Sequence, residues 1–281
     1  MSATAVVLYD ETPSGVATIT INRPKSMNSL SGEVFTKLNE IAKKLRYSKT
    51  AKVVVLTGAG NRAFSAGNDV KGGSFTAGAE YDPRLQVDTI EALDALPQPL
   101  ICAVNGVCYT GALELLMPAD IIVATKNSSV FCDTHARLGL VPTWGLSVRL
   151  PRKIGLSNAK IMSFTGRKFN GDDAQKIGLV DMLFDDDKLM NETFKLAEEM
   201  AVNSFDSIRK QKKMMDYGFM SSQREALAWT DEVNGFHPGF AKDMKERLKP
   251  FGIIATQEGD LGGGRDGGAE SCAMLGVMKD P

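Results

Sequence analysis

The sequence contains few of the residues that bind metals or form disulfides. Its 281 residues include two histidines and four cysteines, and no two cysteines have the C-x-x-C spacing of a metal or redox site. The cysteines are Cys102, Cys108, Cys132 and Cys272, and most of them lie in apolar stretches. We therefore expect no bound metal, and we expect reduced thiols in a reducing compartment.

Other absences exclude whole classes of protein. No segment approaches the roughly 18 apolar residues that a membrane span needs. The formal net charge of -1 argues against a general nucleic-acid binder. Residues 1–5 lack the basic and apolar regions of a signal peptide, and residues 279–281 are not the peroxisomal tripeptide. We expect a cytoplasmic protein, with mitochondria and peroxisomes as alternatives.

The apolar runs that are present predict an α/β fold. Residues 6–9 and 16–22 read as a β-hairpin, and the second run is rich in β-branched residues. Ser31 is a suitable N-cap for an amphipathic helix that ends near Leu45, and residues 53–57 form an apolar strand. Strand, helix and strand in this order favour helices that cover a partly parallel sheet.

The character of the chain changes toward its C-terminus. Beyond Asp186 the apolar spacing is mostly helical, and the last residues are rich in glycine. We expect a core of residues 1–200, a helical region of residues 201–258 and a flexible Gly-rich tail of residues 259–281.

A glycine-rich segment after the third strand resembles a dinucleotide-binding motif in spacing only. Residues 58–63 match G-x-G-x-x-A, but that motif requires a helix to begin immediately. Residues 64–73 form another loop of small residues instead. We therefore expect no nicotinamide or flavin cofactor.

Residues 100–118 are the most informative stretch. An apolar strand is followed by a turn containing Gly106 and Gly111 and by a short helix that Pro118 ends. Amides at the start of that helix have no partner within it and suit an oxyanion. Glu114 stands among leucines, and burial would raise the pKa of its carboxyl toward the range of proton transfer at neutral pH. The alternative is a solvated glutamate beside ordinary turn glycines.

Several motifs occur together in one order. They are Ala63-Phe-Ser-Ala-Gly-Asn-Asp69, Ala103-Val-Asn-Gly106 with Gly111 and Glu114, Leu138-Gly-Leu-Val-Pro142 and Phe164-Thr-Gly166. With this order and spacing, residues 5–250 resemble the enoyl-CoA hydratase/isomerase (crotonase) superfamily. The resemblance implies a spiral of β-β-α units, a helical C-terminal trimerisation region and an acyl-CoA thioester substrate.

The resemblance also implies an oxyanion hole. Two backbone amides hold the thioester oxygen in that superfamily, and matched by position they fall on Ser65 and Gly111. Ser65, Ala66, Gly67, Asn68 and Asp69 would line the acyl-CoA channel. Only the main-chain amide of Ser65 is invoked, and the alternative is an ordinary loop serine.

Glu114 matches the first of the two catalytic glutamates of hydratases, and His135 stands where the second glutamate is expected. His135 could relay protons, since imidazole titrates near neutrality. Alternatively, Asp133 and Arg137 could hold it in a structural network.

Three functions follow from these residues. The first is an enoyl-CoA hydratase that uses Glu114, with or without His135. The second is an enoyl-CoA isomerase or another reaction with a single acid/base group, and the third is a non-catalytic acyl-CoA-binding protein. Coenzyme A is part of the substrate, and no other cofactor is expected. Apolar residues in the helical region favour a homotrimer or a dimer of trimers.

Overall fold

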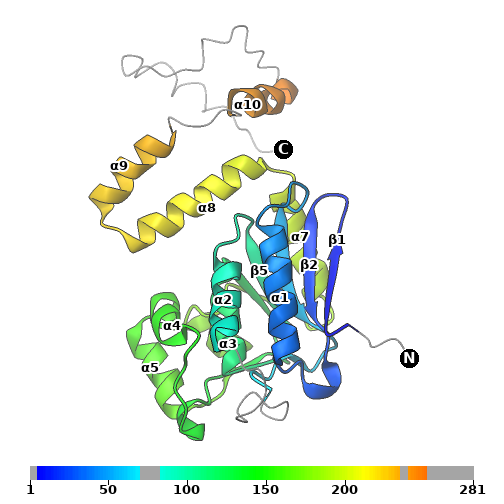
Figure 1. Cartoon of the computed structure of the whole chain (residues 1–281), viewed down its shortest axis with the longest axis vertical. Helices are drawn as coiled ribbons and strands as arrows, with labels where there is room; N and C mark the ends of the chain where they lie inside the picture. The colour runs from blue at the N-terminus through cyan, green and yellow to red at the C-terminus, as the bar shows by residue number, and fades with distance from the viewer. Residues whose placement is uncertain (1–4, 70–82, 235–239, 252–281) are drawn as a thin grey trace. The chain divides into compact units, whose positions relative to one another are not determined.

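A computed structural model describes residues 5–69, 83–234 and 240–251 (Figure 1). The chain divides into two compact units, Met1–Met215 and Asp216–Pro281. The domain boundaries expected after residues 200 and 258 remain predictions, and the Gly-rich tail lies outside the described residues. No helix in the described part of the chain is long and apolar enough to cross a membrane.

The first unit contains two β-sheets. The larger sheet has six strands in the spatial order β1 (Val7–Glu11), β2 (Val16–Ile21), β3 (Val53–Gly58), β5 (Leu100–Val104), β7 (Ile121–Thr125) and β10 (Met182–Phe184). β1 and β2 form the expected antiparallel hairpin, and the remaining neighbours are parallel. The smaller sheet has the order β4 (Ala63–Ser65), β6 (Val107–Tyr109), β8 (Val130–Cys132) and β9 (Phe169–Asn170).

The two sheets grow together along the chain. β3, β5 and β7 of the larger sheet are followed by β4, β6 and β8 of the smaller sheet, and each pair leads into helical structure. The helical segments after these pairs are α2 (Pro83–Asp94), α3 (Gly111–Leu116), and η2 (Ala136–Leu138) with α4 (Leu146–Ile154). This repetition is the expected spiral of β-β-α units, and the α/β fold is confirmed.

Helices cover both faces of the larger sheet. α1 (Gly32–Leu45) packs against α2, and the two run side by side in Figure 1. The other face packs on α7 (Leu189–Ala201). Neighbouring strand residues alternate between the two cores: Val54 belongs to the core that contains α1, and Val55 to the core that contains α7. A sheet buried on both faces explains why its strands are almost wholly apolar.

The remaining helical elements are η1 (Pro24–Ser26), α5 (Leu156–Thr165), α6 (Gly171–Lys176), α8 (Phe205–Met220), α9 (Gln223–Asn234), α10 (Phe240–Leu248) and η3 (Lys249–Phe251). Ser31 caps α1 as expected, since its hydroxyl accepts a hydrogen bond from the Val34 amide at 3.4 Å. In the second unit the rings of Tyr217 and Trp229 lie 4.5 Å apart.

The sequence interpretation missed two of the strands that build the smaller sheet. It treated the residues of β4 as part of a loop and those of β6 as part of a turn, whereas both are strands. Each has three residues, too few for an alternating pattern to stand out. Their pairing depends on contacts between distant parts of the chain, and it places the ends of β4, β6 and β8 next to one another.

Candidate active site

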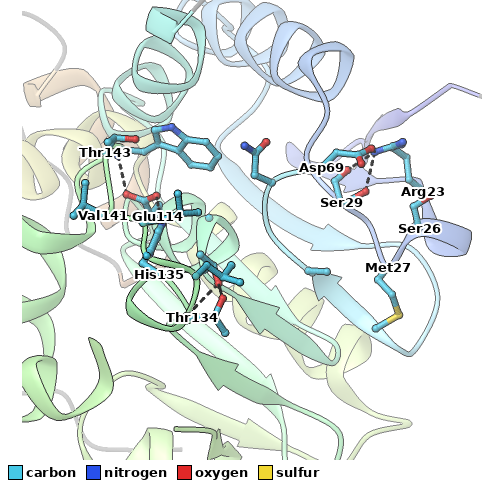
Figure 2. A pocket seen from close by; sticks show the side chains of 18 of the residues that line it. Arg23, Ser26, Met27, Ser29, Asp69, Glu114, Thr134, His135, Val141 and Thr143 are labelled. Carbon is cyan, nitrogen blue, oxygen red and sulfur yellow. Dashed lines mark hydrogen bonds and ion pairs between the residues drawn. The ribbon is translucent and has the colours of Figure 1, made fainter. Parts of the chain in front are cut away.

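A cavity of about 1100 Å³ opens where β4, β6 and β8 end. Its wall is formed by residues that follow these strands, together with residues 23–29 before α1 and residues 138–144 before α4. Figure 2 shows Glu114 and His135 on one side of the cavity and Arg23, Ser29 and Asp69 on the other. Because β4, β6 and β8 are parallel, segments far apart in sequence meet at this one edge.

Glu114 is a buried carboxylate of the cavity wall. Its residue is 2% exposed, and its Oε1 accepts hydrogen bonds from the Trp144 amide at 2.7 Å and the Leu146 amide at 3.3 Å. Burial raises the pKa of the Glu114 carboxyl above its usual value, and these two amides and the charge of His135 offset only part of that effect. Two amides thus hold one oxygen, which leaves Oε2 for other partners.

That second oxygen faces His135. Nε2 of His135 lies 3.6 Å from Oε2 of Glu114, so the carboxyl and the imidazole can share a proton after a small movement. Both side chains line the cavity, and Figure 2 shows them next to each other. The alternative of a solvated Glu114 is wrong, because the residue is buried.

The other ring nitrogen of His135 contacts Asp133. Nδ1 lies 2.6 Å from Oδ1 of Asp133, and the same oxygen accepts the His135 main-chain N–H at 3.1 Å. Burial acts to raise the pKa of Asp133, but hydrogen bonds, above all from His135, outweigh it and hold that pKa below its usual value. Asp133 is therefore an ionised carboxylate at neutral pH. Glu114, His135 and Asp133 form one connected chain of groups.

Gly111 begins α3 at the cavity wall. A Cβ added there would lie 2.5 Å from Cζ3 of Trp144, so no larger residue fits without moving that ring. Trp144 is itself held edge-on against Phe35, with ring centroids 5.0 Å apart. Gly111 is the first residue of the helix, so its N–H finds no acceptor carbonyl within the helix.

Thr110 connects the ends of two neighbouring strands. Its φ of 54° and ψ of -109° are uncommon for a residue with a Cβ. Its N–H donates to the Cys132 carbonyl at 2.9 Å, and its hydroxyl is hydrogen bonded to that of Thr134. These bonds fix the segment that carries Gly111 beside the segment that carries His135.

The opposite side of the cavity contains a fixed ion pair. Nη1 of Arg23 lies 2.7 Å from Oδ2 of Asp69 and also donates to the carbonyl and the hydroxyl of Ser29, at 2.7 Å and 3.0 Å. The sequence interpretation did not anticipate that β4 would bring Asp69 to this arginine, and no local pattern could have shown it.

Within residues 5–69, 83–234 and 240–251, no group of three or more His, Cys, Asp and Glu side chains is placed to hold a metal. The described cysteines Cys102, Cys108 and Cys132 are free thiols in buried positions. Cys272 lies outside the described residues.

Comparison with known proteins decides the family. The family model described as enoyl-CoA hydratase/isomerase matches residues 11–252. The chain belongs to this family. The resemblance drawn from the sequence motifs is therefore confirmed.

Individual members of the enoyl-CoA hydratase/isomerase family match most of the chain. The short-chain-enoyl-CoA hydratase of Clostridium acetobutylicum is 31% identical over 249 residues, which cover 84% of this chain and 90% of that protein. The crystal structure of enoyl-CoA hydratase from Bacillus anthracis has a TM-score of 0.78 at 31% identity and covers 82% of this chain and 90% of its own. The structure of a monofunctional enoyl CoA isomerase from M. smegmatis has a TM-score of 0.68 at 35% identity, and the match covers 79% of this chain and 98% of that chain.

The placement of residues 65–69 corrects one expectation for an enzyme of this family. Ser65 is fully buried in β4 and does not line the cavity, and its hydroxyl accepts the Gly67 N–H at 3.1 Å. Gly67 is not part of the wall either, whereas Ala66, Asn68 and Asp69 are. The chain leaves the sheet after Ser65 and lines the cavity from Ala66 onward, except at Gly67.

The main chain of Asn68 lies at the cavity wall close to the start of α3. The amides of Ala66 and Asp69 donate to the carbonyls of Met27 and Leu30, at 2.9 Å and 3.0 Å. The Asn68 amide has no such acceptor within the described parts of the chain. Its nitrogen lies 3.3 Å from where a Cβ on Gly111 would be. The Asn68 amide therefore lies close to Gly111 at the cavity wall.

Proposed function

We propose that this member of the enoyl-CoA hydratase/isomerase family is an enoyl-CoA hydratase. It adds water reversibly to a 2-enoyl-CoA and forms a 3-hydroxyacyl-CoA. The observation that carries the proposal is the buried pair of Glu114 and His135, whose Oε2 and Nε2 lie 3.6 Å apart in the cavity wall. Family membership supports the acyl-CoA substrate.

The thioester oxygen binds between the amides of Asn68 and Gly111. Negative charge develops on this oxygen as water adds to Cβ, and donors already in place stabilise it without reorganising. Loss of one such donor typically costs about 3–4 kcal/mol of transition-state stabilisation. The segment Ala66–Asp69 lies along the bound thioester, and its Asn68 supplies one of the two donors.

Glu114 and His135 move the protons. Glu114 takes a proton from water while the water oxygen forms its bond to Cβ. The protonated Nε2 of His135 gives its proton to Cα, which converts the enolate into the 3-hydroxyacyl-CoA product. The proton on Glu114 then passes to Nε2 across the short gap between them, and the pair returns to its starting state. One water is consumed: its oxygen and one hydrogen form the hydroxyl, and its other hydrogen replaces the proton that His135 gave to Cα.

Isomerisation of a 3-enoyl-CoA is the second candidate. It needs a single acid/base pair that removes a proton at Cα and returns one at Cγ, and the wall offers one carboxyl beside His135 rather than two glutamates. The M. smegmatis relative at 35% identity is named as an isomerase. A third possibility, acyl-CoA binding without turnover, has no such support.

The enzyme acts as a homotrimer or a dimer of trimers and needs no cofactor beyond the coenzyme A of its substrate. Exposed apolar side chains on α8, such as Met215, Phe219 and Met220, support an assembly. A reducing compartment such as the cytoplasm suits the buried free thiols.

Two substrates separate these functions. Crotonyl-CoA loses the absorbance of its conjugated thioester when it is hydrated, and a 3-enoyl-CoA gains that absorbance when it is isomerised. We expect the first reaction to be faster. Isomerisation without hydration would replace the proposal by the second candidate, and binding without either reaction would replace it by the third.

A further inference from the structure

Asp133 is a buried carboxylate that touches the acid/base pair from behind. It follows β8 directly and is fully buried. Its Oδ1 lies 2.6 Å from Nδ1 of His135 and 3.1 Å from the main-chain nitrogen of the same residue. One oxygen thus holds both the backbone and the ring of His135, and the ring has little freedom to rotate.

The charge of Asp133 determines which nitrogen of a neutral His135 ring carries the proton. Asp133 has a lowered pKa, so at neutral pH its carboxylate has no proton to donate. At 2.6 Å, Nδ1 must therefore be the donor. The mobile proton is then left to Nε2, the atom that lies 3.6 Å from Oε2 of Glu114. Without this acceptor, a neutral ring would place its proton on Nε2 and donate it to Glu114.

We infer that Asp133 is a positioning residue that keeps His135 in the Nδ1–H form, so that Nε2 and Glu114 exchange one proton during turnover. Its effect on turnover rests on the proposed function, whereas its effect on the ring does not.

A purely structural role for Asp133 makes a different prediction. Its bond to the main-chain N–H of His135 stabilises the turn that precedes η2. If that were its whole contribution, replacing it would lower stability and leave the protonation of the ring and the turnover of folded protein unchanged.

The first test is made on the wild-type protein with 15N-labelled histidine. The sequence has two histidines, and the variant His237→Gln assigns the signals. At alkaline pH, where the ring is neutral, we expect Nδ1 of His135 to give the signal of a protonated nitrogen and Nε2 that of an unprotonated one. The opposite pattern would overturn the inference whether or not any variant folds.

The second test is a double-mutant cycle on crotonyl-CoA hydration. Asp133→Asn keeps the shape of the side chain and removes its charge. We expect it to lower kcat by roughly 10²-fold or more, within the range that one acid/base group contributes, with little change in KM. In a His135→Ala background the same change should cost nothing further, because Asp133 acts only through the ring.

Asp181→Asn is the matched control. Asp181 accepts the Ile122 amide at 2.7 Å and pairs with Lys153, outside the cavity, so the variant should keep the wild-type kcat and His135 signals. An equal loss from Asp133→Asn in both backgrounds would overturn the inference. If His135→Ala keeps the wild-type kcat, the positioning of His135 by Asp133 has no role in turnover, although the proposed hydration stands. If the wild-type protein turns over no substrate, the proposed function fails, and the NMR signals of the His135 ring still test the role of Asp133.

Discussion

The two sides of the cavity each contain a buried carboxylate, but the partners of those carboxylates differ. On one side Asp69 pairs with Arg23 at 2.7 Å. On the other side Glu114 faces His135 at 3.6 Å, with Asp133 behind the ring. An arginine does not give up its proton in proteins, whereas a carboxyl and an imidazole can exchange one, and burial raises the pKa of the Glu114 carboxyl.

This contrast indicates that one ion pair maintains the structure of the cavity and that the other pair of groups takes part in the reaction. The ion pair of Arg23 and Asp69 holds charges that stay fixed, so it positions the segment that carries Asn68. The pair of Glu114 and His135 holds a proton that can move. Changes on the Glu114 side should therefore act mainly on kcat, and changes on the Arg23 side mainly on stability.

The largest effect is expected from Glu114→Gln. Glutamine can still accept the two amide hydrogen bonds but cannot exchange a proton, so kcat should fall by roughly 10⁴-fold, the upper end for one acid/base group. Acyl-CoA binding, measured by calorimetry, should stay near the wild-type value. Glu40→Gln, the same change at an exposed site on α1, is the control. Activity of Glu114→Gln within a few fold of wild type would remove Glu114 from the mechanism.

A smaller loss is expected from His135→Ala, because Glu114 can still activate water. We expect kcat to fall by roughly 10²- to 10³-fold, and thermal unfolding checks that the protein remains folded. Unchanged turnover of a less stable protein would make His135 structural.

The variant His135→Glu provides the pair of carboxylates that the resemblance implies for hydratases of this family. We expect at most a modest gain in crotonyl-CoA hydration, since Asp133 would then face a second carboxylate in a buried site. A gain of about a hundredfold or more, the low end for one acid/base group, would show that the native reaction is not simple hydration.

Gly111→Ala tests the amide at the start of α3. The new Cβ would lie 2.5 Å from Trp144, so either the ring or the amide must move. We expect a loss of about 1–3 kcal/mol in the free energy of unfolding and a fall of roughly 10²-fold in kcat, as for a misplaced oxyanion donor. Gly32→Ala is the control, because a Cβ there meets no atom within 4 Å. Equal effects of the two changes would contradict the role of Gly111.

Burial of Glu114 also predicts how stability depends on pH. Its pKa is raised in the folded protein, so ionisation favours the unfolded chain once the pH exceeds the ordinary glutamate value of about 4.3. The stability that Glu114 provides is complete below that pH and is lost as the pH rises through the folded pKa. Glu114→Gln should therefore be more stable than wild type at neutral pH and equal to it in acid. Denaturant unfolding at both pH values checks this, and an advantage confined to acid would contradict it.

The smallest effect on turnover is expected from Arg23→Lys. Lysine keeps the charge beside Asp69 but cannot also reach both oxygens of Ser29. We expect a loss of about 1 kcal/mol per lost hydrogen bond in stability and a kcat close to that of wild type. A loss of kcat as large as that of His135→Ala would break the distinction between the two sides of the cavity.

The sequence predicted those parts of the site that depend on neighbouring residues. Glu114 among leucines and Gly111 at a helix start are local patterns, and both lie at the cavity as expected. The amide of Asn68 could not be derived in this way, because its position depends on where β4 ends and on the pairing of β4 with β6. The ion pair of Arg23 with Asp69 likewise joins residues that only the fold brings together.

The most direct test of a proton shared by Glu114 and His135 is the double-mutant cycle of Glu114→Gln and His135→Ala on crotonyl-CoA hydration. Groups that act as a unit are not additive, and removing both costs about as much as removing the more important one. We therefore expect the double variant to have the kcat of Glu114→Gln alone. Losses that multiply would show that the two residues act independently, and would contradict the account.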